Sequence, residues 1–232
     1  MITAVIPVRN EAKSIGKVIN CLSSASVDII IPVINGTTDD SLQIIKQIDG
    51  GNIFYCYFTE PLGYDIPRAI GATVALKLNS SLSIFIDGDM SGNIKHNIDE
   101  LIISINKKKL DLALTDCYPN YKPEDISPLA KQILEVRKTL NQQLLLQHIG
   151  TASPSHGPHA LSGKFLKMMP LHLFAIPPAL LAIASKNNLK VGIGTSIPHS
   201  VLGSPLKDST HSTMISETII GDCAEALQIY LN

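Results

Sequence analysis

The stretch Leu82-Ser83-Ile84-Phe85-Ile86-Asp87-Gly88-Asp89 decides the predicted fold. Residues 82–86 form an apolar run, typical of a central parallel strand that helices cover on both faces. Side chains two residues apart on an extended segment project to the same side, so Asp87 and Asp89 can face one hard cation. Ligands of open α/β sheets bind beyond the carboxyl ends of the strands. The stretch therefore predicts a diphosphate held on a bound cation, with Gly88 leaving room for the phosphates; the plainer alternative is an acidic turn that caps a helix.

Short apolar runs alternate with helical patterns around this stretch, as they do in parallel βαβ units. The expected strands are residues 3–8, 28–34, 53–58, 82–86, 110–115 and 190–197. The expected helices are residues 11–22, 67–78, 97–106 and 129–148, one that ends near residue 50, one after Pro178 and one from Ser209. Within the second strand, Pro32 indicates a bulge or a position whose N–H is not needed.

No repeat and no linker interrupts this pattern. We therefore predict a single α/β domain over residues 1–232, with a mostly parallel central sheet flanked by helices. Residues 1–118 form its expected nucleotide-binding half. Residues 119–232 form a less regular half with a C-terminal helix, which the family resemblance described below makes the expected acceptor half.

The composition restricts the class of protein. Apolar residues make up 45% of the chain and charged residues 17%, which favours a folded domain over a disordered chain. The formal net charge of −1 provides no basic field, so no nucleic acid partner is expected. The four cysteines are scattered and form no CxxC pair, which argues against a disulfide framework or a cysteine-built zinc site.

Met1 leads directly into a strand-like run, and no apolar run is long enough to span a bilayer. We therefore expect a cytoplasmic protein without a transmembrane segment. The sequence leaves open whether the protein forms a homodimer.

Four segments, in this order along the chain, resemble the family 2 glycosyltransferases, which have the GT-A fold. They are AVIPVRNE (residues 4–11), NGTTDDS (residues 35–41), residues 63–71 with Arg68 and Gly71, and Asp87-Gly88-Asp89. The resemblance implies transfer of a sugar from a nucleotide-diphosphate sugar, with Mn²⁺ or Mg²⁺ on Asp87 and Asp89. Ile197-Pro198-His199 is similar to the segment that completes the metal site in the retaining glucosyl-3-phosphoglycerate synthase group, which makes His199 the expected third ligand.

The resemblance also implies roles for single residues. The expected nucleotide-sugar-binding residues are Pro7, Arg9, Glu11, Asn35, Gly36, Asp39, Gly63, Arg68, Asp87, Gly88 and Asp89. Arg68 and Asp89 are the expected catalytic residues, because an arginine and a bound metal would stabilise the departing diphosphate.

Each of four assignments has a plainer alternative. Glu11 and Asp39 can be a first-turn helix carboxylate and a helix cap. Arg68 can form a surface ion pair, and His199 can be an exposed loop residue. Ile34 replaces an acidic residue of the second segment, so no uridine specificity is predicted.

The acceptor is expected to be a small molecule or a lipid-linked one. Its expected pocket is lined by His156, His159, Ser162 and Gly163. Inverting members of the family carry an acidic general base just before the helix that follows Pro178, but only Glu135 provides a carboxylate between Asp125 and Asp208. Two interpretations therefore stay open: a retaining transferase that needs no separate base, and a nucleotide-sugar-binding protein without efficient transfer. A nucleotidyltransferase is disfavoured, because residues 9–12 lack its Gly-rich loop.

Overall fold

The computed structural model describes residues 1–48, 50–122, 124, 126–204 and 209–232. In this part of the chain one sheet has the strand order β3-β2-β1-β4-β6-β5-β7. The strands are β1 (Ile2–Val8), β2 (Ile29–Asn35), β3 (Cys56–Phe58), β4 (Leu82–Phe85), β5 (Leu112–Asp116), β6 (His159–Ser162) and β7 (Val191–Ser196). Only β6 runs antiparallel to its neighbours among these strands, so the predicted mostly parallel α/β sheet is confirmed.

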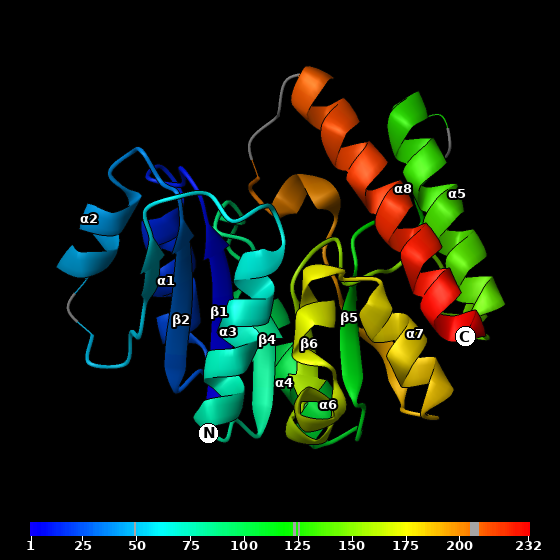
Figure 1. Cartoon of the computed structure of the whole chain (residues 1–232), viewed down its shortest axis with the longest axis horizontal. Coiled ribbons are helices and arrows are strands. Elements are labelled where there is room, and N and C mark those ends of the chain that lie inside the picture. Colours follow the sequence, from blue (N-terminus) through cyan, green and yellow to red (C-terminus); the bar gives the residue numbers. More distant parts are fainter. Residues whose placement is uncertain (49, 123, 125, 205–208) are drawn as a thin grey trace.

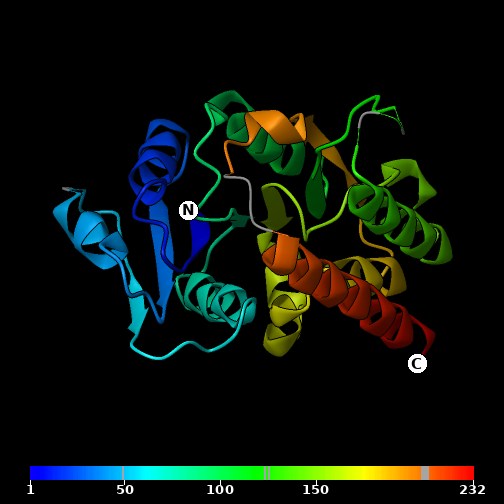
Figure 2. The same cartoon turned by 90° about the horizontal axis from the view of Figure 1, so that it is seen from above.

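Helices cover both faces of the sheet (Figures 1 and 2). The α-helices are α1 (Ile15–Ser24), α2 (Ser41–Gln47), α3 (Ile66–Lys77), α4 (Lys95–Asn106), α5 (Pro128–Gln143), α6 (Gly163–Met168), α7 (Ala179–Lys186) and α8 (Ser209–Leu231). Short 3₁₀ helices are η2 (Gln147–Ile149), η3 (Leu171–Ala175) and η4 (His199–Val201). α1 and α4 lie on one face and α3, α6 and α7 on the other, where α8 packs on α5 and α7.

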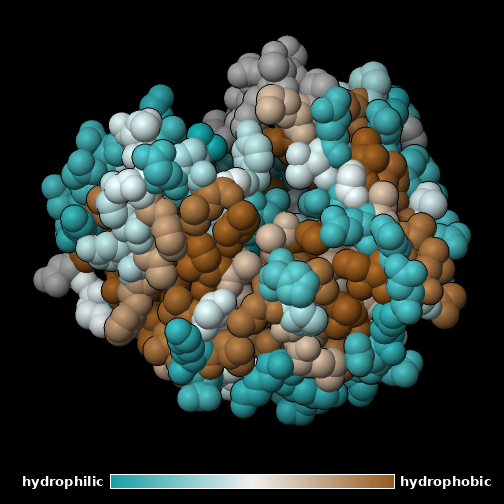
Figure 3. All heavy atoms as spheres, viewed as in Figure 1, coloured by the Kyte–Doolittle hydropathy of each residue, from teal (hydrophilic) through white to brown (hydrophobic). Residues whose placement is uncertain are grey.

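Side chains alternate between two cores along the central strands. In β1, Ala4 and Ile6 pack with α1 and α4, whereas Val5 packs with α3 on the opposite face. In β4, Ile84 and Phe85 divide in the same way. The apolar run that predicted a strand covered on both faces is therefore buried on both. On the face shown in Figure 3, apolar atoms gather around α3.

Two helix boundaries differ from the prediction. α1 begins at Ile15 instead of residue 11, and Asn10, just before the predicted start, has φ 58° and accepts a hydrogen bond from the Thr38 N–H at its Oδ1. α5 ends at Gln143 instead of residue 148, since Leu145 has φ 60°. Positive φ in a residue other than glycine is incompatible with a continuing α-helix.

Pro32 explains why the predicted strand 53–58 is shorter in the structure. The Ile30 N–H donates to Asn52, so the nitrogen of Pro32, two residues on, faces the same edge of β2. Pro32 has no N–H to offer there, and β3 pairs only from Val33 onward, beginning at Cys56. Pairing with β1 continues through Pro32 without a bulge.

The sequence analysis missed β6. Its residues His159–Ser162 lie between β4 and β5 and pair antiparallel with both. Four residues directly after a Gly-Pro loop carry too short a pattern to predict a strand. Within the described residues, no helix combines the length and apolar character needed to cross a membrane.

Gly71 allows α3 to lie directly against β1. A Cβ atom at this position would come 2.1 Å from Cγ1 of Val5, which is fully buried and β-branched. Gly71 therefore sets the distance between α3, which carries Arg68, and the centre of the sheet.

We predict that Gly71→Ala lowers the free energy of unfolding by about 1–3 kcal/mol, because the added methyl overpacks the contact with Val5. Denaturant unfolding measures the change. Gly221→Ala is the matched control on another helix, where no atom lies within 4 Å of the added methyl. It should be neutral or stabilise by up to about 1 kcal/mol. Equal stability of the two variants would contradict the close packing of α3 on β1.

Candidate functional site

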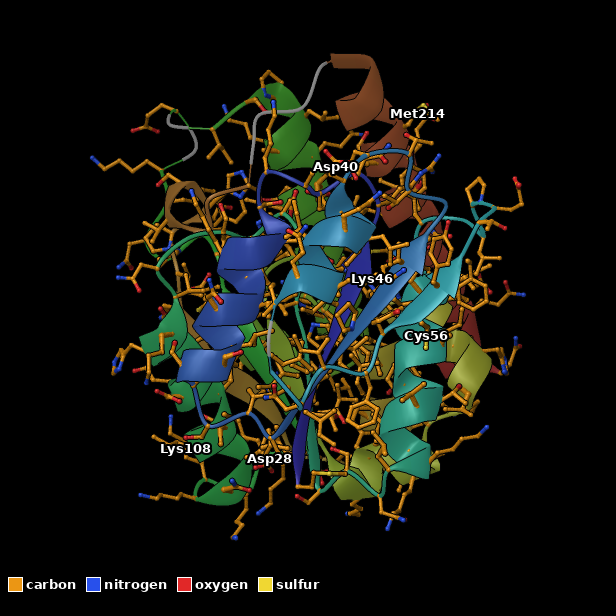
Figure 4. All side chains as sticks on the ribbon, turned by 90° about the vertical axis from the view of Figure 1, so that its left-hand side faces the viewer. Asp28, Asp40, Lys46, Cys56, Lys108 and Met214 are labelled. Carbon is orange, nitrogen blue, oxygen red and sulfur yellow. The ribbon has the colours of Figure 1, made fainter. Side chains whose placement is uncertain are left out.

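A cleft of about 500 Å³ opens beyond the carboxyl ends of β1, β2 and β4. The described residues that line it are Pro7, Val8, Arg9, Asn10, Glu11, Asn35, Tyr64, Asp65, Pro67, Arg68, Asp87, Gly88, Asp89, Ser155, Pro177, Ile215, Thr218, Ile219 and Asp222. In Figure 4, Asp40 and Met214 lie together at one end of the molecule, whereas Asp28 and Lys108 lie at the opposite end. The surface is hollowed between α3 and α8 in Figure 3.

Arg68 joins two carboxylates in the wall of the cleft. Its side chain is only 10% exposed, and its Nε donates to Oδ1 of Asp65 over 2.8 Å. One terminal guanidinium nitrogen donates to Oδ1 of Asp87. Burial acts to lower the pKa of Arg68, but the charges of Asp87 and Asp65 outweigh it and raise that pKa. Arg68 therefore stays cationic in a buried ion pair, which corrects the surface-pair alternative.

The segment after β4 lies directly against the end of β1. The Gly88 N–H donates to the Pro7 carbonyl over 3.2 Å. A Cβ atom at Gly88 would stand 3.0 Å from that oxygen and 3.2 Å from Cγ of Glu11. Gly88 is thus required by contacts within the protein, and the room it was predicted to leave for a diphosphate is taken by Pro7 and Glu11. Asp89 Oδ1 accepts a hydrogen bond of 3.1 Å from Ser204 Oγ.

Asn35 ties the end of β2 to the loop before α3. Its Oδ1 accepts a hydrogen bond from the Leu62 N–H, and its Nδ2 donates to the Gly63 carbonyl, each over 2.7 Å. Gly36, at φ 60°, has no room for a side chain, because a Cβ atom would lie 2.6 Å from the Pro61 nitrogen. Asn35 lines the cleft, whereas Gly36 and Gly63 do not line it and shape the loop that carries Tyr64 and Asp65.

Asp39 also lies outside the cleft lining. Its Oδ2 accepts a hydrogen bond from the Ala12 N–H over 2.9 Å, and its Oδ1 accepts from the N–H and Oγ of Ser41. Burial acts to raise the pKa of Asp39, but these hydrogen bonds outweigh it and lower the pKa. Asp39 thus joins the turn before α1 to the first residue of α2, where Asp40 holds the N-cap position, and its nucleotide-binding role stays a prediction.

His156 and His199 contact each other. His156 Nε2 lies 3.1 Å from His199 Nδ1, and the ring of Tyr118 stacks on His199. Across the described ranges, no three His, Cys, Asp or Glu side chains are grouped so that they could hold a metal ion. The structure therefore does not assemble the predicted set of Asp87, Asp89 and His199.

Three predicted acceptor-binding residues serve the scaffold instead. His159 is 1% exposed and stacks on Phe85 in the core. Ser162 donates to Asp111 Oδ1 and caps α6, and it pairs with Leu82, at the end of β4 remote from Asp87. A Cβ atom at Gly163 would lie 2.6 Å from a backbone oxygen. The prediction is corrected for these residues: His159 is buried against Phe85, whereas the antiparallel β6 carries Ser162 and Gly163 to the end of β4 that is remote from the cleft.

The sequence analysis missed the contribution of α8. Ile215, Thr218, Ile219 and Asp222 line the cleft at a spacing of three and four residues, which places them on one face of the helix. The spacing is visible in the sequence. Nothing in the sequence indicates that the last helix returns to the ends of β1 and β4.

Asp222 has an unusual environment for a carboxyl group. Burial, then the charges of Asp65 and Glu225, raise its pKa from 3.8 to about 6. The carboxylate form of Asp222 is therefore less favourable in the folded protein than in the unfolded chain.

We predict that Asp222→Asn stabilises the protein at about pH 8, by about 1 kcal/mol, because water still reaches this half-buried side chain. The raised pKa means that the protonated wild-type carboxyl stabilises the fold at low pH. This contribution is lost as pH rises through about 6. The variant and the wild type should therefore unfold alike near pH 4. Thermal unfolding across this range measures the effect.

The control for this prediction is Glu217→Gln, an exposed carboxyl of the same helix. It should show no such pH dependence. A constant difference in stability between Asp222→Asn and wild type at every pH would contradict the raised pKa.

Comparisons with known proteins agree on one fold. The model of glycosyl transferase family 2 matches residues 3–158. Glucosyl-3-phosphoglycerate synthase from Mycobacterium tuberculosis, in complex with Mn²⁺, UDP and phosphoglyceric acid, is 17% identical, with a TM-score of 0.66 over 98% of this chain and 78% of that chain. The complex with Mn²⁺ and UDP-glucose is 16% identical, with a TM-score of 0.67 over 97% of this chain and 79% of that chain. No curated protein sequence matches the chain.

Proposed function

Since this chain belongs to glycosyl transferase family 2, we propose that it transfers a glycosyl group from a UDP-sugar to a small acceptor, with a divalent cation in the cleft. The choice of UDP rests on the structures of similar fold, which hold UDP with Mn²⁺ or Mg²⁺. A cleft of about 500 Å³ falls in the range of sites for small ligands.

The charge of the cleft is the observation that carries the proposal. Among the residues that the structure describes, its charged lining consists of two arginines and five carboxylates, namely Arg9, Arg68, Glu11, Asp65, Asp87, Asp89 and Asp222. With all of them ionised, the carboxylates outnumber the arginines by three. Such a cleft repels a free diphosphate. A divalent cation bound between the carboxylates and the diphosphate attracts both and so overcomes this repulsion.

Asp87 and Asp89 have the donor atoms that such a cation requires. Mg²⁺ and Mn²⁺ prefer carboxylate oxygens, and Mg²⁺ is usually held by one or two carboxylates together with substrate phosphates. A third protein ligand is therefore not needed, which fits the separate contacts of His199. The cation would supply positive charge to the diphosphate as it leaves.

The chain itself contributes the positions of these groups. Arg68 holds Asp87 in the cleft wall and brings a cation close to where the phosphates would lie. Pro7 and Asn35, at the ends of β1 and β2, line the part of the cleft next to the loop of Tyr64. We assign the nucleoside to this part, because the diphosphate must reach Asp87 and Asp89 at the end of β4.

We predict that UDP binds in the presence of Mn²⁺ at least about tenfold more tightly than in EDTA, and that Asp89→Asn abolishes this gain. Titration calorimetry measures both. Asp40→Asn, at an exposed aspartate outside the cleft lining, is the control and should bind like the wild type. Mn²⁺-independent binding in the wild type would overturn the metal assignment.

Turnover separates an enzyme from a binding protein. A panel of UDP-sugars with Mn²⁺ should release UDP from at least one donor, slowly with water and faster with an acceptor. Tight Mn²⁺-dependent binding without UDP release from any donor would favour the alternative, a nucleotide-sugar-binding protein without efficient transfer.

A further inference from the structure

We propose that Asp222 of α8 is the general base of this transfer, so that the sugar is transferred with inversion at its anomeric carbon. This inference rests on the proposed function and adds a catalytic residue and a stereochemical outcome to it. It also supplies a general base from another helix, since the chain lacks a carboxylate just before the helix that follows Pro178, where inverting members of this family are expected to have one.

The position of Asp222 is the first argument. The cleft is bounded by the ends of β1, β2 and β4 and by the face of α8 that carries Ile219 and Asp222. A general base must reach the attacking hydroxyl, which approaches the anomeric carbon from the side opposite the departing diphosphate. A carboxylate on α8 comes from a different element than Asp87 and Asp89, so the phosphates and the acceptor can occupy separate parts of the cleft.

Availability is the second argument. Of the other cleft carboxylates, Asp65 and Asp87 bind Arg68, and Asp89 accepts a hydrogen bond from Ser204. Glu11 accepts one from Ser14. In the part of the chain that the structure describes, Asp222 makes no hydrogen bond and no ion pair. Its oxygens are therefore available to an incoming hydroxyl.

The electrostatic setting suits proton transfer. Burial and the charges of Asp65, at the start of α3, and Glu225, on α8 itself, raise the pKa of Asp222 to about 6. A base with a pKa slightly below the working pH is ionised and still binds a proton well. The remaining titratable groups that line the cleft within the described ranges are Arg9, Glu11, Tyr64, Arg68, Asp87 and Asp89.

The proposed step is a single displacement. The acceptor hydroxyl gives its proton to the Asp222 carboxylate, and its oxygen forms a bond to the anomeric carbon. The bond from that carbon to the diphosphate oxygen breaks, and the electron pair leaves with UDP. Asp222 then releases the proton to water. With water as the acceptor, the same step hydrolyses the donor.

Hydrolysis of UDP-glucose in the presence of Mn²⁺ tests this proposal without a known acceptor. The wild type should release β-glucose first from this α-linked donor, as followed by proton NMR. Asp222→Asn should lower the rate by about 100-fold or more without weakening UDP binding, because a general base contributes to the reaction and not to donor binding. Glu217→Gln, on an exposed part of α8 outside the cleft lining, should keep the wild-type rate.

The pH profile distinguishes a base from a residue that only supports the fold. The wild-type rate should fall as pH drops below about 6, and Asp222→Asn should lose this limb. Asp222→Glu should recover part of the rate. Release of α-glucose first, or a full rate with an unchanged limb in Asp222→Asn, would overturn this inference alone. Absence of turnover of every UDP-sugar by the wild type would overturn the proposed function with it.

Discussion

The buried ion pair of Arg68 with Asp65 and Asp87 holds the cleft together. A buried guanidinium is costly unless its charge is matched, so the two carboxylates and the arginine must stay in place together. Asp65 precedes α3 and Asp87 follows β4. The ion pair through Arg68 therefore links the start of a helix to the end of a strand. Gly71 allows the link to form, because α3 can approach β1 closely only without a side chain there.

The same carboxylates create the electrostatic problem that a ligand must solve. Among the described residues, more negative than positive groups line the cleft, so the proposed anionic donor would need a cation to bind there. Arg68 neutralises part of this charge but is shared between two partners. The negative charge of the cleft also affects Asp222, because burial and the charge of Asp65 both disfavour its carboxylate form. Burial and these negative charges thus raise the pKa of the proposed base, and the same charges underlie the proposed metal dependence.

The ends of parallel strands could be predicted, since the apolar runs fixed their positions and carboxyl ends meet at one edge of a sheet. Pro7, Asn35, Arg68 and Asp89 therefore lie in one cleft, as expected from the order of the segments. Ser162 was misplaced because β6 is short and antiparallel, so its direction reverses which residues reach the cleft. The role of α8 depends on how distant parts of the chain pack, and local periodicity carries no information about that.

The placement of a divalent cation is the central claim, and anomalous diffraction tests it most directly. Crystals of the protein grown with UDP and Mn²⁺ would be measured near the manganese absorption edge. The account predicts one strong anomalous peak in contact with carboxylate oxygens of Asp87 or Asp89 and with the diphosphate of UDP. UDP bound in the cleft without such a peak, or a peak remote from both carboxylates, would contradict it.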